Sequence, residues 1–238
     1  MAGPMRYDLI SFDLDGTLVD TADEIAEAAN RALESNGLAR RPMAEITMLI
    51  GAGTRELMRK LLSHLIHDEP ALAESLDAAA VLASMDTHYA ETTGTSAQPY
   101  PGCVDTLVRL KAAGIRLACT TNKELHHAKR VLEVTGLDHF FDLVIGGDSL
   151  PQKKPDASVL QHVMSVLKSD ARRTAHVGDS AIDVMAAKNA GVSAWAVPYG
   201  YNAGVPVADS KPDQLFHALP EVADFALAPA ESTPARAA

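Results

Sequence analysis

Two aspartates, Asp13 and Asp15, directly follow a short apolar segment near the start of the chain. The segment, residues 9–12, is predicted to be a buried strand, because Gly16 provides a turn just after the aspartates. In an extended chain, residues two apart point to the same side, so both carboxylates face one direction. Such a pair can act as nucleophile and acid–base, or bind a hard cation such as Mg²⁺. Capping of the turn is an ordinary alternative, and the pair alone leaves both interpretations open.

Polar side chains also follow later apolar segments. Thr121 and Asn122 end one segment, Asp179 follows another with Asp183 one helical turn later, and Lys154 precedes a predicted helix. Open α/β sheets bind ligands beyond the carboxyl ends of their strands. A phosphoryl group requires this combination: a carboxylate nucleophile, further carboxylates for a metal, and a lysine and a hydroxyl group for its oxygens. Each residue alone has a structural explanation, as a strand end, a surface charge or a helix-surface acid, but their joint occurrence favours a phosphoryl site.

The elements that must position these residues alternate between strands and helices from residue 101 onward. Three of the predicted helices end at Gly114, Gly136 and Gly191, where glycine C-caps are expected. The predicted helices are 103–113, 125–135, 157–167 and 182–190, and the predicted strands are 9–12, 115–121, 141–145, 175–177 and 193–197. This alternation implies parallel βαβ units, so the predicted fold class is α/β, with a doubly wound parallel sheet. The catalytic core is assigned to residues 1–20 and 98–225.

Residues 21–97 interrupt this alternation. A capping-box pattern at 21–24 opens an Ala-rich helix that ends near residue 37, and segments 57–62 and 72–89 add helical periodicity. A connection of this length without structure of its own is disfavoured. We therefore predict an all-helical domain inserted after the first strand. The last residues, 226–238, are rich in Ala, Pro, Ser and Thr and are predicted to form a flexible tail.

Four motifs of this chain resemble those of the haloacid dehalogenase superfamily. The first is Asp13-Leu14-Asp15-Gly16-Thr17-Leu18-Val19-Asp20, followed in order by Thr121-Asn122, Lys154-Pro155 and Gly178-Asp179-Ser180-Ala181-Ile182-Asp183. The resemblance covers about residues 6–225, and the inserted helices match the cap that some members carry after the first strand. It therefore implies a Rossmann-like core with a helical cap domain.

The resemblance also implies an activity, phosphate-ester hydrolysis. Asp13 would be the nucleophile that becomes an aspartyl phosphate, and Asp15 would protonate the leaving alkoxide and then activate water. Mg²⁺ would bind the Asp13 carboxylate, the Asp15 backbone carbonyl and Asp179, with Asp183 ordering the surroundings. Asp15 argues against a dehalogenase, because dehalogenating relatives lack this second aspartate.

The phosphate-binding residues implied by the resemblance are Thr121, Asn122 and Lys154. The first two would bind phosphoryl oxygens, and the lysine would offset the charge of phosphate and nucleophile. One departure follows the third motif, where Asp156-Ala157 replaces the second proline found in many relatives. We expect this change to alter only the loop.

Within the superfamily, several segments resemble phosphoglycolate phosphatases: Ile50-Gly51-Ala52-Gly53, Pro99-Tyr100-Pro101-Gly102, Thr121-Asn122-Lys123 and Gly200-Tyr201-Asn202. The favoured function is hydrolysis of 2-phosphoglycolate with Mg²⁺. Phosphatases of N-acetylmuramic acid 6-phosphate or of a sugar phosphate, and phosphomutases, stay open as alternatives. A non-enzymatic phosphate-binding module is disfavoured, because it needs neither a cap nor the acid Asp15.

The substrate carboxylate suggests one further residue, Arg55. It stands at the start of a predicted cap helix, where a guanidinium could bind a carboxylate through two hydrogen bonds. A solvated surface arginine is the competing interpretation. His176 likewise is either close to the site or a packed core residue.

Composition limits partners and compartment. The 238 residues contain 21 Lys plus Arg and 31 Asp plus Glu, a formal charge of −10, which disfavours nucleic acids and anionic membranes as partners. Only two cysteines are present, and Cys119 is expected to be a buried free thiol, so a reducing compartment is favoured. No signal peptide or membrane-spanning segment is predicted, and the expected location is the cytoplasm. The sequence leaves the oligomeric state undetermined.

Overall fold

A computed structural model describes residues 6–229. Its main feature is a six-stranded sheet with the order β5-β4-β1-β6-β7-β8, in which every neighbouring pair is parallel. The strands are β1 (Leu9–Phe12), β4 (Arg116–Thr120), β5 (Leu143–Ile145), β6 (Thr174–Gly178), β7 (Ser193–Ala196) and β8 (Gln214–Leu215). The central strand β1 pairs Phe12 with Cys119 on one side and with Val177 on the other. The loops after β1, β4 and β6 therefore emerge at one edge of the sheet.

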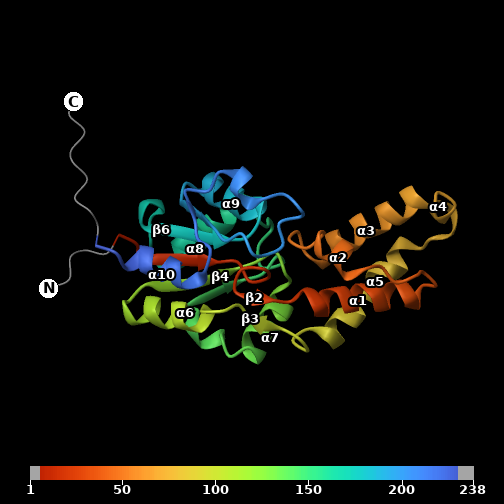
Figure 1. The fold of residues 1–238 in the computed structure, drawn as a ribbon, viewed down its shortest axis with the longest axis horizontal. Coiled ribbons are helices and arrows are strands. Elements are labelled where there is room, and N and C mark those ends of the chain that lie inside the picture. The colour runs from red at the N-terminus through yellow and green to blue at the C-terminus, as the bar shows by residue number, and fades with distance from the viewer. Residues whose placement is uncertain (1–5, 230–238) are drawn as a thin grey trace.

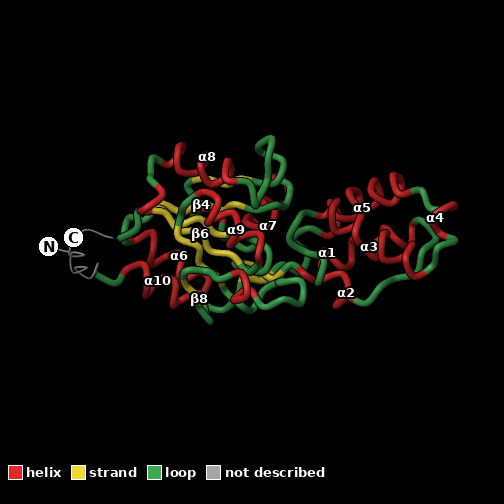
Figure 2. The backbone as a smooth tube through the Cα atoms, turned by 90° about the horizontal axis from the view of Figure 1, so that it is seen from above, coloured by secondary structure: helices red, strands yellow, loops and turns green. Residues whose placement is uncertain are grey.

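Helices cover both faces of the sheet. The helices α6 (Cys103–Ala112), α7 (Leu125–Val134) and α10 (Leu219–Leu227) supply apolar residues to one hydrophobic cluster, and α8 (Ala157–Leu167) and α9 (Ala181–Ala190) to another. Figure 2 shows the strands between α8 and the pair α6 and α10. Short 3₁₀ helices cover Asp138–Phe140, Ala171–Arg173 and Val207–Ser210. The predicted doubly wound α/β fold is confirmed.

Residues between β1 and α6 form a helical lobe beside the sheet (Figure 1). Its helices are α1 (Ala22–Ser35), α2 (Met43–Thr47), α3 (Thr54–Asp68), α4 (Leu72–Ser75) and α5 (Ala78–Thr92). They share a separate hydrophobic cluster that contains Leu33, Leu61 and Met85. The chain enters and leaves the lobe through the antiparallel strands β2 (Val19–Asp20) and β3 (Gln98–Pro99).

The helical segment expected at residues 72–89 is divided in two. Leu76 has an extended backbone after α4, and Asp77 caps α5 by accepting a hydrogen bond from the backbone N–H of Ala80 at 3.0 Å. A capping aspartate satisfies an otherwise free N–H and starts a new helix. Periodicity alone did not show this break.

The tail predicted from residue 226 begins too early. Helix α10 continues to Leu227, and Ala226 is buried in the same cluster as Leu219 and Val222. The apolar face of the helix packs on α6, and that packing outweighs the tail-like composition. Residues 230–238 lie outside the described residues.

Both cysteines, Cys103 and Cys119, are buried and free, as expected for Cys119. Burial raises the pKa of the Cys103 thiol to about 12, so it stays protonated at neutral pH. Within residues 6–229, no helix has the length and apolar character needed to cross a bilayer. The cytoplasmic location stays a prediction.

Candidate active site

A pocket lies where the carboxyl ends of β1, β4 and β6 meet the helical lobe. The sheet side contributes the loops that carry Asp13, Thr121 and Asp179, and the lobe contributes residues of α1 and α3. The lining residues are Asp13, Asp15, Ile25, Ile50, Gly51, Gly53, Thr54, Leu57, Thr121, Asn122, Lys123, Asp179, Ser180 and Tyr201. Most of the site residues predicted from sequence therefore meet at one place, from segments far apart in the chain.

Asp13 is the residue on which the proposed chemistry depends. Its carboxylate is almost fully buried, and Oδ1 accepts hydrogen bonds from the backbone N–H of Leu14 at 2.8 Å and from Lys154 Nζ at 3.0 Å. Burial raises the pKa of Asp13 to about 7, with Asp183 and Asp15 adding to the rise and Lys154 opposing it. A bound cation would favour the ionised carboxylate that a nucleophile requires.

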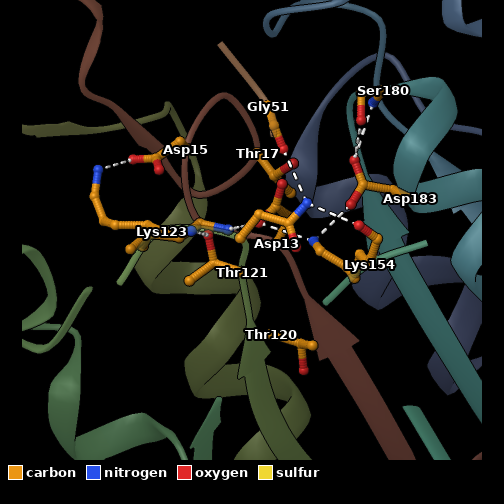
Figure 3. A network of polar contacts seen from close by, with 12 residues as sticks. Asp13, Asp15, Thr17, Gly51, Thr120, Thr121, Lys123, Lys154, Ser180 and Asp183 are labelled. Atoms are coloured by element: carbon orange, nitrogen blue, oxygen red, sulfur yellow. Dashed lines mark hydrogen bonds and ion pairs between the residues drawn. The ribbon is translucent and has the colours of Figure 1, made fainter. Parts of the chain in front are cut away.

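Lys154 and Asp183 form a buried ion pair behind Asp13 (Figure 3). Lys154 Nζ lies 2.7 Å from Asp183 Oδ1, and Ser180 donates both its N–H and its hydroxyl to Asp183 Oδ2. Burial opposes ionisation of Asp183, but Lys154 and His176 together outweigh burial and hold the pKa of Asp183 below its ordinary value. Both oxygens of Asp183 are thus occupied. Its place is consistent with ordering Lys154.

His176 lies beside this pair. The ring is fully buried, with Nε2 3.3 Å from Asp183 Oδ1 and Nδ1 3.1 Å from Ser11 Oγ. Burial lowers the pKa of His176, which favours the neutral ring. Both interpretations of this histidine therefore hold, since it is a packed core residue and also contacts a site residue.

Asp179 lies close to Asp13, and its carboxylate accepts hydrogen bonds from two residues that the motifs did not link to it. Thr17 donates its hydroxyl to Asp179 Oδ1 at 2.9 Å, and the backbone N–H of Tyr201 donates to Oδ2. A side chain at Gly16, where φ is +80°, would place its Cβ 2.4 Å from Asp179 Oδ2. Glycine is therefore required both for the turn and for room beside this carboxylate. Burial, followed by Asp183 and Asp13, raises the pKa of Asp179 well above its ordinary value.

These carboxylates form a donor set suited to a divalent cation. One oxygen each from Asp13, Asp179 and Asp183 can be chosen so that all lie within 4.8 Å of one another. Asp13 and Asp179 line the pocket and Asp183 does not, so Asp13 and Asp179 are the better side-chain ligands. Buried carboxylates that repel one another favour a hard cation with oxygen ligands, and Mg²⁺ has that preference. The residues present fit the predicted metal.

Asp15 is paired with Lys123, for which the motifs predict no role. Asp15 Oδ1 accepts hydrogen bonds from Lys123 Nζ and from Thr21 Oγ1, each at 2.6 Å. Lys123 is 3% exposed. The signal in the sequence was its position directly after Thr121-Asn122, at the same strand end as two predicted site residues.

Thr121 and Asn122 differ in how they meet the pocket. Thr121 lines it, and its hydroxyl oxygen accepts the backbone N–H of Lys123 at 3.2 Å. The Asn122 amide also lines it but donates to the carbonyl oxygens of Gly51 at 3.1 Å and Lys154 at 3.0 Å. Asn122 therefore links the helical lobe to the sheet side, and its amide N–H groups are directed at the backbone.

Arg55 is the predicted site residue that the structure places outside both the pocket lining and the carboxylate cluster. Its side chain is 56% exposed, and its guanidinium lies 3.5 Å from Asp86 Oδ2. The neighbouring residues Thr54 and Leu57 line the pocket instead. Successive helix residues point in directions about 100° apart, so one position decides which side chain faces the substrate.

Comparison with known proteins agrees with this geometry. Residues 10–197 match the family model described as haloacid dehalogenase-like hydrolase. The chain is 40% identical over 230 residues to the plasmid phosphoglycolate phosphatase of Cupriavidus necator, an alignment covering 95% of each chain. It is 39% identical to the phosphoglycolate phosphatase of Vibrio cholerae over 86% of this chain and 90% of that one. A crystal structure of a predicted phosphoglycolate phosphatase from Haemophilus somnus superposes with a TM-score of 0.86 at 30% identity, covering 94% of this chain and 99% of the other. The chain belongs to the haloacid dehalogenase-like hydrolases.

Proposed function

We propose that this phosphatase hydrolyses 2-phosphoglycolate to glycolate and phosphate, with Mg²⁺ and through an aspartyl-phosphate intermediate. The observation that carries the proposal is the buried Asp13 carboxylate, held 3.0 Å from Lys154 at a pocket that also contains Asp15 and Asp179. This is the set that phosphoryl transfer requires. The substrate follows from relatives named phosphoglycolate phosphatase that are 39–40% identical over most of the chain.

In the first half-reaction, a carboxylate oxygen of Asp13 attacks phosphorus. The bond from phosphorus to the ester oxygen breaks, and Asp15 gives a proton to the departing alkoxide of glycolate. In the second half-reaction, water attacks phosphorus and gives its proton to Asp15. The bond to Asp13 then breaks and releases inorganic phosphate. Asp15 is thereby returned to its protonated form.

In this proposal, a lysine side chain and a bound cation offset the negative charge of the nucleophile and the phosphoryl group. Lys154 lies between Asp13 and Asp183, where it offsets the charge of the nucleophile and the phosphoryl oxygens. Mg²⁺ would be held by the Asp13 carboxylate, the Asp15 backbone carbonyl and Asp179, and would supply further positive charge for the phosphoryl group. Thr121, whose side chain lines the pocket, would bind a phosphoryl oxygen.

The helical lobe acts as a cap in this proposal. The sequence assigns residues 21–97 to the cap and residues 1–20 and 98–225 to the catalytic core, and we extend the core through the end of α10 at Leu227. Ile25 of α1 and Thr54 and Leu57 of α3 form the cap wall of the pocket. A wall of this kind excludes water while the ester is cleaved and lets the cap select the leaving group.

The test is a panel of phosphate esters assayed for phosphate release with Mg²⁺ and with a chelator. The expected result is the highest kcat/KM for 2-phosphoglycolate and loss of turnover on chelation. A higher kcat/KM for a sugar phosphate or N-acetylmuramic acid 6-phosphate would change the substrate assigned to the enzyme and leave the proposed mechanism unchanged. Isomerised product without phosphate release would identify a phosphomutase. Full activity in chelator would contradict the metal.

A further inference from the structure

Lys123 is a buried cation that the proposed phosphoryl chemistry does not use. Among the pocket-lining residues it is the one Lys or Arg side chain, since Lys154 lies behind Asp13. Burial opposes the charge of Lys123, but Asp15 and Tyr89 together outweigh burial and raise the pKa of Lys123 above its ordinary value. The ammonium group is therefore charged. A buried charge of this kind requires an anionic partner.

The two lysines lie on opposite sides of the nucleophile. Figure 3 shows Lys154 with Asp183 on one side of Asp13, and Lys123 with Asp15 on the other. Lys154 Nζ already contacts the carboxylates of Asp13 and Asp183. Lys123 Nζ donates to Asp15 Oδ1 at 2.6 Å and also interacts with the Tyr89 hydroxyl. An ammonium has three N–H donors, so one is left for a further acceptor.

The position of Lys123 matches the leaving-group end of the substrate. The ester oxygen must come within hydrogen-bond reach of Asp15, which protonates it. In 2-phosphoglycolate the carboxylate carbon is separated from that oxygen by a single methylene. A cation bonded to Asp15 is therefore within reach of the substrate's carboxylate. Arg55, exposed and directed at Asp86, is outside this region.

We propose that Lys123 is the specificity-determining residue that binds the carboxylate of the leaving group, donating to it from the same ammonium that contacts Asp15. The inference rests on the proposed function and names the group recognised. With the substrate bound, Lys123 forms charge-assisted hydrogen bonds to both carboxyl groups, and these are stronger than neutral ones. The neutral alcohol of an otherwise equal substrate would lack this charge.

The cap contributes to the same site. Lys123 Nζ lies 5.2 Å from the centre of the Tyr89 ring of α5, and Glu24 of α1 also interacts with its charge. Glu24 Oε2 accepts the backbone N–H of Gly94 at 2.9 Å, so this carboxylate is held by the cap. Burial raises the pKa of Glu24, and the charge of Lys123 opposes that rise. Recognition of the leaving group by Lys123 thus takes place where core and cap meet.

The first experiment compares two substrates of nearly equal size, 2-phosphoglycolate and 2-hydroxyethyl phosphate, in which an alcohol replaces the carboxylate. Lys123→Met should lower kcat/KM for 2-phosphoglycolate about 10- to 150-fold more than for 2-hydroxyethyl phosphate, the effect of a lost hydrogen bond to a charged group. Lys60→Met, an equal charge change on the exposed surface of α3, should alter both substrates by less than about twofold. Arg55→Met should leave the substrate ratio unchanged.

A second measurement covers the case in which Lys123→Met does not fold because Asp15 is left unpaired. The double variant Asp15→Asn/Lys123→Met removes both charges of the pair and therefore that conflict, and Asp15→Asn, which keeps Lys123, is its reference. Calorimetry would compare their affinities for 3-phosphonopropionate and 3-hydroxypropylphosphonate, two analogues that cannot be hydrolysed. The double variant should lose affinity for the carboxylate analogue only. Equal affinity of both variants for it would overturn the assignment.

The outcomes separate the inference from the function on which it rests. A wild-type enzyme without preference for 2-phosphoglycolate over 2-hydroxyethyl phosphate would refute both the function and the role of Lys123. A wild-type preference that survives in Lys123→Met would refute only the role of Lys123. Equal losses on both substrates would show that Lys123 positions Asp15 and does not bind the substrate. If Arg55→Met removed the preference for 2-phosphoglycolate over 2-hydroxyethyl phosphate, Arg55 and not Lys123 would be the residue that binds the carboxylate.

Discussion

Replacing Lys154 with methionine tests the electrostatic structure of the site. The side chain has similar length but no charge, so Asp13 and Asp183 lose a cation that lies 3.0 and 2.7 Å from their Oδ1 atoms. Removing one partner of a buried ion pair costs about 3–5 kcal/mol, because the other partner stays buried and uncompensated. The free energy of unfolding of a native protein is about 5–15 kcal/mol. We therefore expect Lys154→Met to lose a large part of this free energy.

The assay is urea unfolding in the presence of a chelator, so that no bound cation offsets the lost charge. The adjacent lysine provides the control. Lys153 is exposed, and its Nζ donates to the carbonyl oxygen of Ala52 at 2.6 Å. Lys153→Met has the same sequence neighbourhood and the same change in charge, and should cost about 1 kcal/mol or less. The difference between the two variants isolates the buried charge.

The stability difference between wild type and Lys154→Met should also depend on pH, in a direction that the pKa of Asp183 determines. In the wild type, Lys154 holds the pKa of Asp183 below its ordinary value of 3.8, so this stabilisation is present above pH 3.8 and is lost as the pH falls through the folded-state pKa. Without Lys154, burial dominates and the carboxylates favour protonation. The stability difference between wild type and Lys154→Met should therefore be large at pH 7.5 and smaller near pH 4. Equal stability of the Lys153 and Lys154 variants at pH 7.5, or a difference that grows on acidification, would refute the reasoning.

Three further predictions concern the nucleophile, the acid–base and His127, a buried histidine of the core helix α7. Asp13→Asn should abolish phosphate release with an unchanged circular dichroism spectrum, and activity within about tenfold of wild type, ~1.4 kcal/mol of barrier, would contradict its role. Asp15→Asn should still be phosphorylated by an aryl phosphate with a good leaving group and then stall, because each proton-transfer step contributes about 10²–10⁴-fold. Intact-mass spectrometry after an acid quench should detect the adduct, and equal impairment on good and poor leaving groups without an adduct would argue against the assignment. Burial, with His126 adding to it, lowers the pKa of His127 from its ordinary 6.5 to about 4, so the free energy of unfolding should fall as pH decreases between these values. His127→Gln should weaken this acid sensitivity in urea unfolding, and an unchanged slope would exclude His127 as its source.

The parts of the site that could be predicted are those attached to regular strands. Asp13, Thr121 and Asp179 each follow a strand that is parallel to its neighbours, so their convergence follows from topology alone. The fold was predictable for the same reason, since alternating apolar strands and glycine-terminated helices admit few arrangements. The strand expected to end at Thr121 ends at Thr120, and this leaves the Thr121 side chain in the loop that faces the pocket.

The parts that could not be predicted depend on side-chain direction. Arg55 and Thr54 are adjacent in sequence, yet Thr54 lines the pocket and Arg55 faces solvent and Asp86. The pairing of Lys123 with Asp15 joins loops after two different strands. A long flexible side chain can reach many partners, and only the packed cap around it selects one. Chemical type and position in the chain were known for both residues, but the direction of each side chain was not.

Tyr201 explains why the core and the cap form one site. Its backbone N–H donates to Asp179, a candidate metal ligand, while its hydroxyl accepts the backbone N–H groups of Thr21 at 2.8 Å and Ala22 at 2.9 Å, where α1 begins. That hydroxyl also donates to Asp20 at the end of β2. One residue of a late loop thus joins the carboxylate cluster to the first turn of the cap. Because Thr21 in turn donates to Asp15, a shift of α1 must disturb the acid–base as well as the pocket wall. The position of the cap and the geometry of the chemistry are therefore set by the same few contacts.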